Sequence, residues 1–120
     1  MSGFKYRTWD KQAKVMEQYH YLQLSPNGQL YHDGMNVTDK YEILRFTGLK
    51  DKNGKEVYEG DILKEKDIIT EVVFHDYQWK EKLIRSPRNH LKNYFPFRDT
   101  LPFTAEVLGN IYDNPELLKK

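Results

Sequence analysis

The sequence contains no cysteine, and its charges nearly cancel. Without cysteine, neither a disulfide framework nor a thiolate metal site can form. Nineteen basic residues stand against eighteen acidic ones, for a formal net charge of +1. The chain therefore has no global electrostatic field that would direct it to nucleic acid or to a membrane surface. Only a local cluster of charge could do so.

Long apolar runs are missing as well. The N-terminal residues contain no apolar stretch of signal-peptide length, and no run approaches the roughly 18 apolar residues of a membrane span. Together with the lack of cysteine, this predicts a soluble protein of the cytoplasm without a membrane partner.

Catalytic and cofactor-binding motifs are also absent. None of the serines lies in a nucleophile elbow, the glycines are spread among turns, and the four histidines lack zinc-site spacing. We therefore expect no enzyme, no cofactor and no metal. One alternative remains open, because the pairs His32–Asp33 and His75–Asp76 could converge around the metal of a hydrolase.

Aromatic residues are abundant. Nine Tyr, six Phe and two Trp make up 14% of the chain, which favours strands. A length of 120 residues fits one domain, residues 1–120. Short alternating segments with turn signals between them predict a mainly-β fold, as a small barrel or sandwich of antiparallel strands.

The N-terminal part shows the clearest hairpin. Alternation predicts a strand at residues 4–10, followed over residues 11–18 by one helical turn or an exposed connector. The sequence SPNG separates two strands at about 19–24 and 29–32, giving an extra N-terminal hairpin. A further strand is expected within residues 40–49.

The C-terminal part alternates strands and irregular segments. Residues 61–84 hold three short strands, with the middle one largely buried. Three prolines predict a long loop over residues 85–103, with at most one helical turn. Residues 104–113 return to strand with a bulge at Gly109, and Asn114 is expected to cap a short C-terminal helix.

The segment FTGLKDKNGKEVYEGDIL, residues 46–63, concentrates turn signals. Its layout resembles the loops and bends of small SH3-like barrels. Its carboxylates could form a pair for acid–base chemistry or a hard cation, but local backbone contacts explain short acidic side chains at turns better. We interpret six residues as a structural turn motif: Gly48, Asn53, Gly54, Glu59, Gly60 and Asp61.

A basic and aromatic stretch follows. Between Gln78 and Arg98, six basic residues stand against Glu81 alone, a local charge of +5. Basic groups bind phosphates and exposed rings stack on bases, so the stretch could bind nucleic acid. It also suits a protein interface, or a solvated loop held to the core by its rings. The candidate binding residues are Trp79, Lys80, Lys82, Arg85, Arg88, Lys92, Tyr94 and Arg98.

Three blocks, FKYRTWDK, RFTGLKDKNGKEVYEGDIL and EVLGNIYDNPELL, together resemble the YopX family of small phage and prophage proteins. The resemblance implies a β-rich protein with an SH3-like barrel element, encoded by a phage or prophage in a bacterial host, and it brings no catalytic residues. We therefore expect a non-catalytic module that binds a protein partner or another copy of itself. Nucleic-acid binding is the alternative, and a metal-dependent hydrolase is the third.

Overall fold

The computed structural model describes residues 5–18, 22–87 and 93–119. The chain divides into two compact units, Met1–Arg45 and Phe46–Lys120. Antiparallel strands dominate both units, which confirms the predicted mainly-β class. No helix among the described residues is long and apolar enough to cross a membrane.

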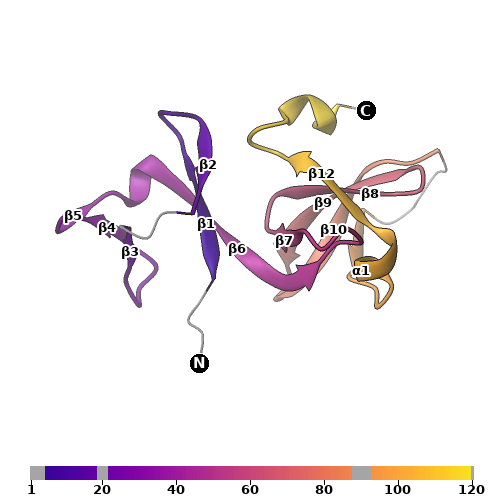
Figure 1. Cartoon of the computed structure of the whole chain (residues 1–120), viewed down its shortest axis with the longest axis horizontal. Coiled ribbons are helices and arrows are strands. Elements are labelled where there is room, and N and C mark those ends of the chain that lie inside the picture. Colours follow the sequence, from indigo (N-terminus) through magenta and orange to yellow (C-terminus); the bar gives the residue numbers. More distant parts are fainter. Residues whose placement is uncertain (1–4, 19–21, 88–92, 120) are drawn as a thin grey trace. The chain divides into compact units, whose positions relative to one another are not determined.

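In the first unit, the hairpin of β1 (Tyr6–Asp10) and β2 (Val15–Glu17) lies beside β6 (Tyr41–Lys50) (Figure 1). The helical turn or connector expected at residues 11–18 is wrong, because part of this segment is β2. Asp10 Oδ1 accepts the backbone N–H groups of Gln12 and Ala13, and Lys14 takes φ +59°. A side-chain carboxylate thus closes a turn that contains neither Gly nor Pro.

A three-stranded meander completes this unit: β3 (Gln23–Leu24), β4 (Leu30–His32) and β5 (Met35–Asn36), followed by the 3₁₀ turn η1 (Thr38–Lys40). The hairpin predicted around SPNG is confirmed for its described strands, whereas residues 19–21 lie outside the described part. Leu22, Leu30 and Val37 are buried together and form the core of the unit.

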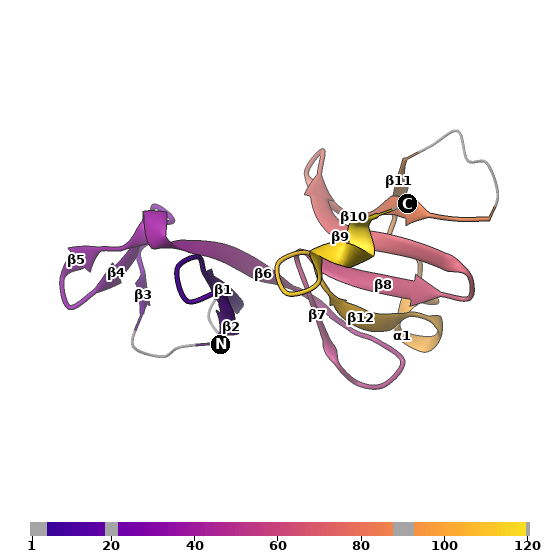
Figure 2. The same cartoon turned by 90° about the horizontal axis from the view of Figure 1, so that it is seen from above.

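The second unit contains a five-stranded antiparallel sheet in the order β11-β10-β9-β8-β12 (Figure 2). Its strands are β8 (Asp61–Glu65), β9 (Ile68–His75), β10 (Gln78–Arg85), β11 (Tyr94–Pro96) and β12 (Glu106–Asn110). The three strands predicted within residues 61–84 are confirmed. The register of β12 against β8 shifts between Val107 and Gly109, as expected for the predicted bulge.

The sheet curls around one core as part of a small barrel. The last residues of β6 pair with β7 (Glu56–Tyr58), and a single turn of helix, α1 (Leu101–Thr104), precedes β12. This core consists of Val57, Leu63, Val72, Leu101 and Ala105. On the other side, a smaller cluster of Ile62, Ile69 and Ile84 is covered by Ile111 and Leu117.

The predicted loop over residues 85–103 is wrong in one respect, because it contains the strand β11, whereas the single helical turn α1 agrees with the prediction. Leu83 N–H donates to the Asn93 carbonyl, and hydrogen-bonded pairs alternate along an antiparallel ladder. Pro96, which opposes Lys80, therefore occupies a position that needs no N–H. A proline is tolerated in such an edge strand. Residues 88–92 lie outside the described part.

The C-terminal helix is a 3₁₀ turn, η2 (Pro115–Leu118), and Asn114 does not cap it with its side chain. Instead, Asn114 Oδ1 accepts the backbone N–H of Asn110 at 3.2 Å. A Cβ atom added at Gly109 would lie only 2.2 Å from this Oδ1 atom, which is too close for any side chain. Glycine at position 109 thus admits the Asn114 side chain.

Candidate ligand-binding pocket

The turn motif of residues 46–63 is built around Asp51, a residue that the sequence did not single out. Asp51 Oδ1 accepts the N–H groups of Asn53 and Lys55, and Oδ2 accepts that of Val107, each at 2.9 Å. Burial raises the pKa of Asp51, but the three N–H groups and the Lys55 ammonium outweigh it and hold the pKa below its usual value. The carboxylate joins the β6–β7 hairpin to β12.

The acidic residues of the motif also have local surroundings. Asp61 is buried, and its Oδ2 accepts the Tyr58 N–H at 2.8 Å, while Glu59 is half-buried. Gly60, at φ +87°, donates to the Val72 carbonyl and accepts the N–H of Ile111. The motif residues Gly48 and Gly54 likewise have positive φ. These contacts are those of a structural turn.

The part of the basic and aromatic stretch that lies on β10 has side chains on both faces of the sheet. Trp79 packs against the core and meets Phe74 edge-on, with ring centroids 5.2 Å apart. Lys80 is largely covered, and its Nζ lies 3.3 Å from His75 Nδ1 and 3.8 Å from Asp76. Both residues are therefore engaged within the unit, through packing or polar contacts.

Of the remaining candidate residues that the structure describes, two have side-chain partners and two are exposed. The ring of Tyr94 stacks on that of His75 at 4.0 Å, and Arg98 forms an ion pair with Glu65. Lys82 and Arg85 are exposed. The candidates Arg88 and Lys92 lie outside the described residues. Of the basic residues on β10, two are therefore exposed. The described candidates do not form one continuous basic face.

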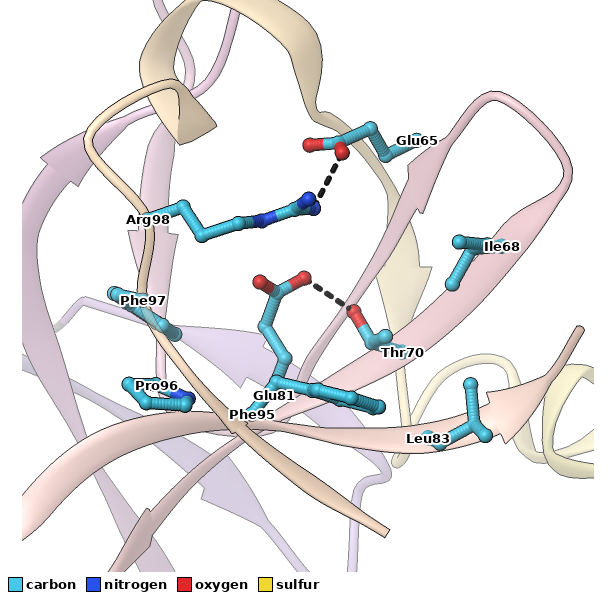
Figure 3. A pocket seen from close by; sticks show the side chains of 9 residues that line it. All are labelled: Glu65, Ile68, Thr70, Glu81, Leu83, Phe95, Pro96, Phe97 and Arg98. Atoms are coloured by element: carbon cyan, nitrogen blue, oxygen red, sulfur yellow. Dashed lines mark hydrogen bonds and ion pairs between the residues drawn. The ribbon is translucent and has the colours of Figure 1, made fainter. Parts of the chain in front are cut away.

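A pocket of about 380 Å³ opens on the face of the sheet that carries Glu81 (Figure 3). Strands β8 to β11 and the segment that follows β11 supply its walls. Apolar side chains form most of the lining, and three charged groups and one hydroxyl converge on it. The lining residues are Glu65, Ile68, Thr70, Glu81, Leu83, Phe95, Pro96, Phe97 and Arg98.

Glu81 is the unusual group of the pocket. It is only 4% exposed, and the Thr70 hydroxyl donates to its Oε1 at 2.8 Å. Burial raises the pKa of Glu81, and the nearby Glu65 carboxylate raises it further. The Thr70 hydrogen bond and the Arg98 guanidinium oppose this shift without reversing it. The pocket therefore contains a carboxyl group whose charge is poorly compensated.

Glu65 is held differently. It forms the ion pair with Arg98, and its Oε2 accepts the Thr104 hydroxyl at 2.6 Å. Its side chain is largely covered, whereas that of Arg98 is half-exposed. Each oxygen of the Glu65 carboxylate thus has a donor from the polypeptide itself.

A second hollow, of about 340 Å³, lies beside Glu71 and Lys82 and is also lined by Asn93 and Leu118. Burial raises the pKa of Glu71, and Lys82, which opposes it across the strands, counteracts this shift. This hollow is more polar in its lining, and its carboxylate already faces a cation.

The two His–Asp pairs are local contacts. His32 lies 3.7 Å from Asp33, and His75 lies 3.5 Å from Asp76, each within its own turn. Within residues 5–18, 22–87 and 93–119, no group of three or more His, Asp or Glu side chains could hold a metal ion.

Sequence reasoning missed the pocket because it counted Glu81 only as a charge. The signal was present in the alternation of β10, where Glu81 occupies the same face as Trp79 and Leu83. A carboxylate between two apolar residues on a core-facing row is a buried charge in an apolar site. Its partner Thr70 and the wall residue Phe95 come from neighbouring strands, whose register the sequence does not specify.

Known structures resemble this chain over its length. The crystal structure of protein EF1440 from Enterococcus faecalis matches with a TM-score of 0.62 and 26% identity, covering 97% of this chain and 98% of that one. The crystal structure of yopX from Bacillus subtilis matches with a TM-score of 0.56 and 21% identity, covering 100% and 98%. A comparison with curated proteins gives no significant match.

The family model described as YopX protein matches residues 5–119. Except for Phe4, this span contains the three sequence blocks that carry the resemblance, together with every residue of the pocket. The chain belongs to the YopX protein family.

Proposed function

We propose that this protein is a non-catalytic binding module whose binding site is the pocket around Glu81. The observation that carries the proposal is a preformed cavity of about 380 Å³ with mostly apolar walls and a buried carboxyl group. Concave apolar sites with a few convergent polar groups are typical of ligand-binding pockets. The occupant we favour is a side chain of a protein partner.

The chemistry of the lining supports binding over catalysis. Thr70 carries the only hydroxyl group of the lining residues, and it is buried and donates to Glu81. Glu65 is engaged by Arg98 and Thr104, so the two carboxyl groups are not both free to transfer protons. Recognition of a partner's side chain requires no such transfer.

Membership of the YopX family supports a proposal about the cell and the kind of gene in which this protein occurs. We place the protein in the cytoplasm of a bacterial host, as the product of a phage or prophage gene, and we relate the curled sheet of its second unit to SH3-like barrels. These assignments rest on the resemblance of the three sequence blocks.

Nucleic-acid binding is the second candidate, favoured by the exposure of Lys82 and Arg85 on β10. Fewer side chains are available for binding nucleic acid than the sequence suggested. Trp79 is packed in the core and Tyr94 is stacked on His75, so neither ring is presented freely to a base.

A pull-down with a blocked pocket tests the proposal. Ile68→Trp places a large ring in the pocket wall, and Lys64→Trp adds the same ring at an exposed position of β8 outside the pocket. From lysate of bacteria that carry the gene, the wild type and Lys64→Trp should retain a partner that Ile68→Trp loses. Near-UV circular dichroism checks that both variants are folded.

A partner retained equally by all three proteins would overturn the role of the pocket. Retained DNA or RNA, released by salt and lost when Lys82 and Arg85 are changed to Glu, would instead establish the second candidate.

A further inference from the structure

We propose that the occupant of the pocket is a cationic group on an apolar stem, the side chain of a lysine or arginine of the protein partner, with its nitrogen bound at Glu81 Oε2. This inference rests on the proposed function and specifies the chemistry of the ligand.

The Glu81 carboxyl group is half satisfied. Its Oε1 accepts the Thr70 hydroxyl, whereas Oε2 has no hydrogen-bond donor among the described residues. Figure 3 shows the carboxyl group directed into the cavity, with Thr70 on one side and Phe97 on the other. A buried carboxylate with an open oxygen is costly, and a charged donor is the partner that compensates it best.

Among residues 5–18, 22–87 and 93–119, no side chain supplies that donor. The Arg98 guanidinium counteracts part of the pKa shift of Glu81, but it forms its ion pair with Glu65 (Figure 3). With both carboxyl groups ionised, Glu65, Glu81 and Arg98 give the lining a net charge of −1. One positive charge on the ligand therefore complements the pocket, whereas an anionic ligand would face the unpaired Glu81 carboxylate.

The walls suit a stem rather than a small hydrated ion. Ile68, Leu83, Phe95 and Phe97 line the cavity. A lysine or arginine side chain can lay its methylene groups along such a surface. Two of the lining residues are phenylalanines, and aromatic rings attract cations in desolvated sites. A volume of about 380 Å³ is within the range of ligand pockets.

Binding of a cation is coupled to the proton on Glu81. Burial raises the pKa of Glu81, so the free pocket shifts the equilibrium of this group toward its protonated form, and a bound cation shifts it back toward the carboxylate. Among the residues that the structure describes, the charged groups that face Glu81 are Arg98 from the segment after β11 and Glu65 from β8. Affinity for an amine should therefore rise with pH across the titration of Glu81, while affinity for a neutral analogue should not.

Three probes of the same length separate charge from hydrophobicity: n-hexylamine, 1-hexanol and hexanoate. They are titrated into the full chain labelled with ¹⁵N, and shifts of the Thr70, Glu81, Leu83 and Phe95 amides report occupancy. We expect hexylamine to bind about tenfold or more tightly than hexanol, as for one charge-assisted hydrogen bond, and hexanoate to bind most weakly.

Two variants assign that preference to Glu81. Glu81→Gln keeps the size of the side chain and an oxygen that can accept from Thr70, and it should abolish the preference for the amine and its pH dependence. Glu71→Gln removes a partly buried carboxylate outside this pocket and should retain both. The same spectra show whether each variant is folded.

Equal affinity for hexylamine and hexanol in the wild type would overturn the inference, as would an amine preference that survives in Glu81→Gln. If the preference is absent but Ile68→Trp still loses the partner, the pocket binds its partner through other chemistry. If no probe shifts the pocket amides and Ile68→Trp keeps the partner, both the inference and the proposed function fail.

Discussion

The Thr70 hydroxyl donates a hydrogen bond of 2.8 Å to Glu81 Oε1, from one strand of the sheet to the next. Thr70 and Glu81 are each 4% exposed. One hydrogen bond does not replace the hydration that an ionised carboxylate loses on burial. The pair therefore places a charge where it opposes folding, which is typical of residues retained for binding.

The first prediction concerns the pH dependence of this cost. Because the pKa of Glu81 is raised by folding, the unfolding free energy of the wild type should fall as pH rises from the pKa of an unfolded Glu through the folded value. Glu81→Gln lacks this loss, so its stability relative to the wild type should increase as pH rises above the pKa of an unfolded Glu and level off above the folded pKa of Glu81. Denaturant unfolding at several pH values measures it.

Glu71 has a pKa shifted in the same direction but is present in both proteins, so its contribution cancels in the difference. Glu116→Gln, at an exposed position, is the matched control. A difference between Glu81→Gln and wild type that stays constant with pH would contradict the prediction.

The second prediction concerns Asp51. Asp51→Asn removes the charge that accepts three backbone N–H groups and should lower the unfolding free energy by about 2–3 kcal/mol at pH 7. The folded pKa is depressed, so this contribution is full above the pKa of an unfolded Asp and disappears as pH falls through the folded value. Thermal or urea unfolding at pH 7 and at acid pH tests both statements.

Asp67→Asn, in the exposed turn between β8 and β9, serves as the control and should change stability little. If the two substitutions have the same effect at pH 7, Asp51 does not join the hairpin to β12 in the way described.

The third prediction concerns the contact between Gly109 and Asn114. Gly109→Ala would place its Cβ 2.2 Å from Asn114 Oδ1, and it should cost about 1–3 kcal/mol because the amide must leave its position and its hydrogen bond. In the background of Asn114→Ala the same substitution should cost much less. A double-mutant cycle by urea unfolding measures the coupling, and additive effects would refute the contact.

The fourth prediction compares two glycines of the turn motif. Gly48 and Gly60 both have positive φ, but an added Cβ has open space at Gly48 and lies 3.4 Å from the Tyr112 ring at Gly60. Gly48→Ala should lower stability by about 1–2 kcal/mol through backbone strain, and Gly60→Ala by at least as much. If Gly60→Ala kept full stability but lost partner binding, the motif would be a site.

The fifth prediction concerns the turn between β9 and β10, where Asp76 and Tyr77 both have positive φ, at 53° and 64°. Tyr77 is 94% exposed, so its ring contributes little packing. Tyr77→Gly should raise the unfolding free energy by about 0.5–1 kcal/mol, because glycine adopts this conformation without strain. Tyr77→Ala retains the strain and should give no gain, which separates backbone strain from loss of the ring.

Alternation and turn chemistry predicted most of the strands, because both are local properties of the chain. The turn at residues 25–28 and the bulge at Gly109 are examples. The strand β2 was missed because the turn before it depends on the Asp10 carboxylate and a positive φ at Lys14, in a segment of good helix formers. The strand β11 was missed because Pro96 is harmless only at a particular place in the ladder.

The candidate site was harder to predict for a different reason. Six basic residues between Gln78 and Arg98 suggested a charged face, but Arg98 is paired with Glu65, which is 33 residues away in the sequence. The role of Asp51 likewise depends on Val107, 56 residues away. Sequence spacing indicates which side chains are present, whereas the register between strands decides which of them are neutralised.

The short strand β11 has a consequence for local opening of the sheet and for how a bound ligand changes it. It forms one wall of the pocket, and its three residues pair with β10. In the described sheet it is an edge strand, so detaching it breaks fewer contacts than opening β9 or β10. A ligand that contacts both Phe95 and Glu81 would hold β11 against β10. Amide hydrogen exchange in β11 should therefore slow on binding, while that of β9 stays nearly unchanged.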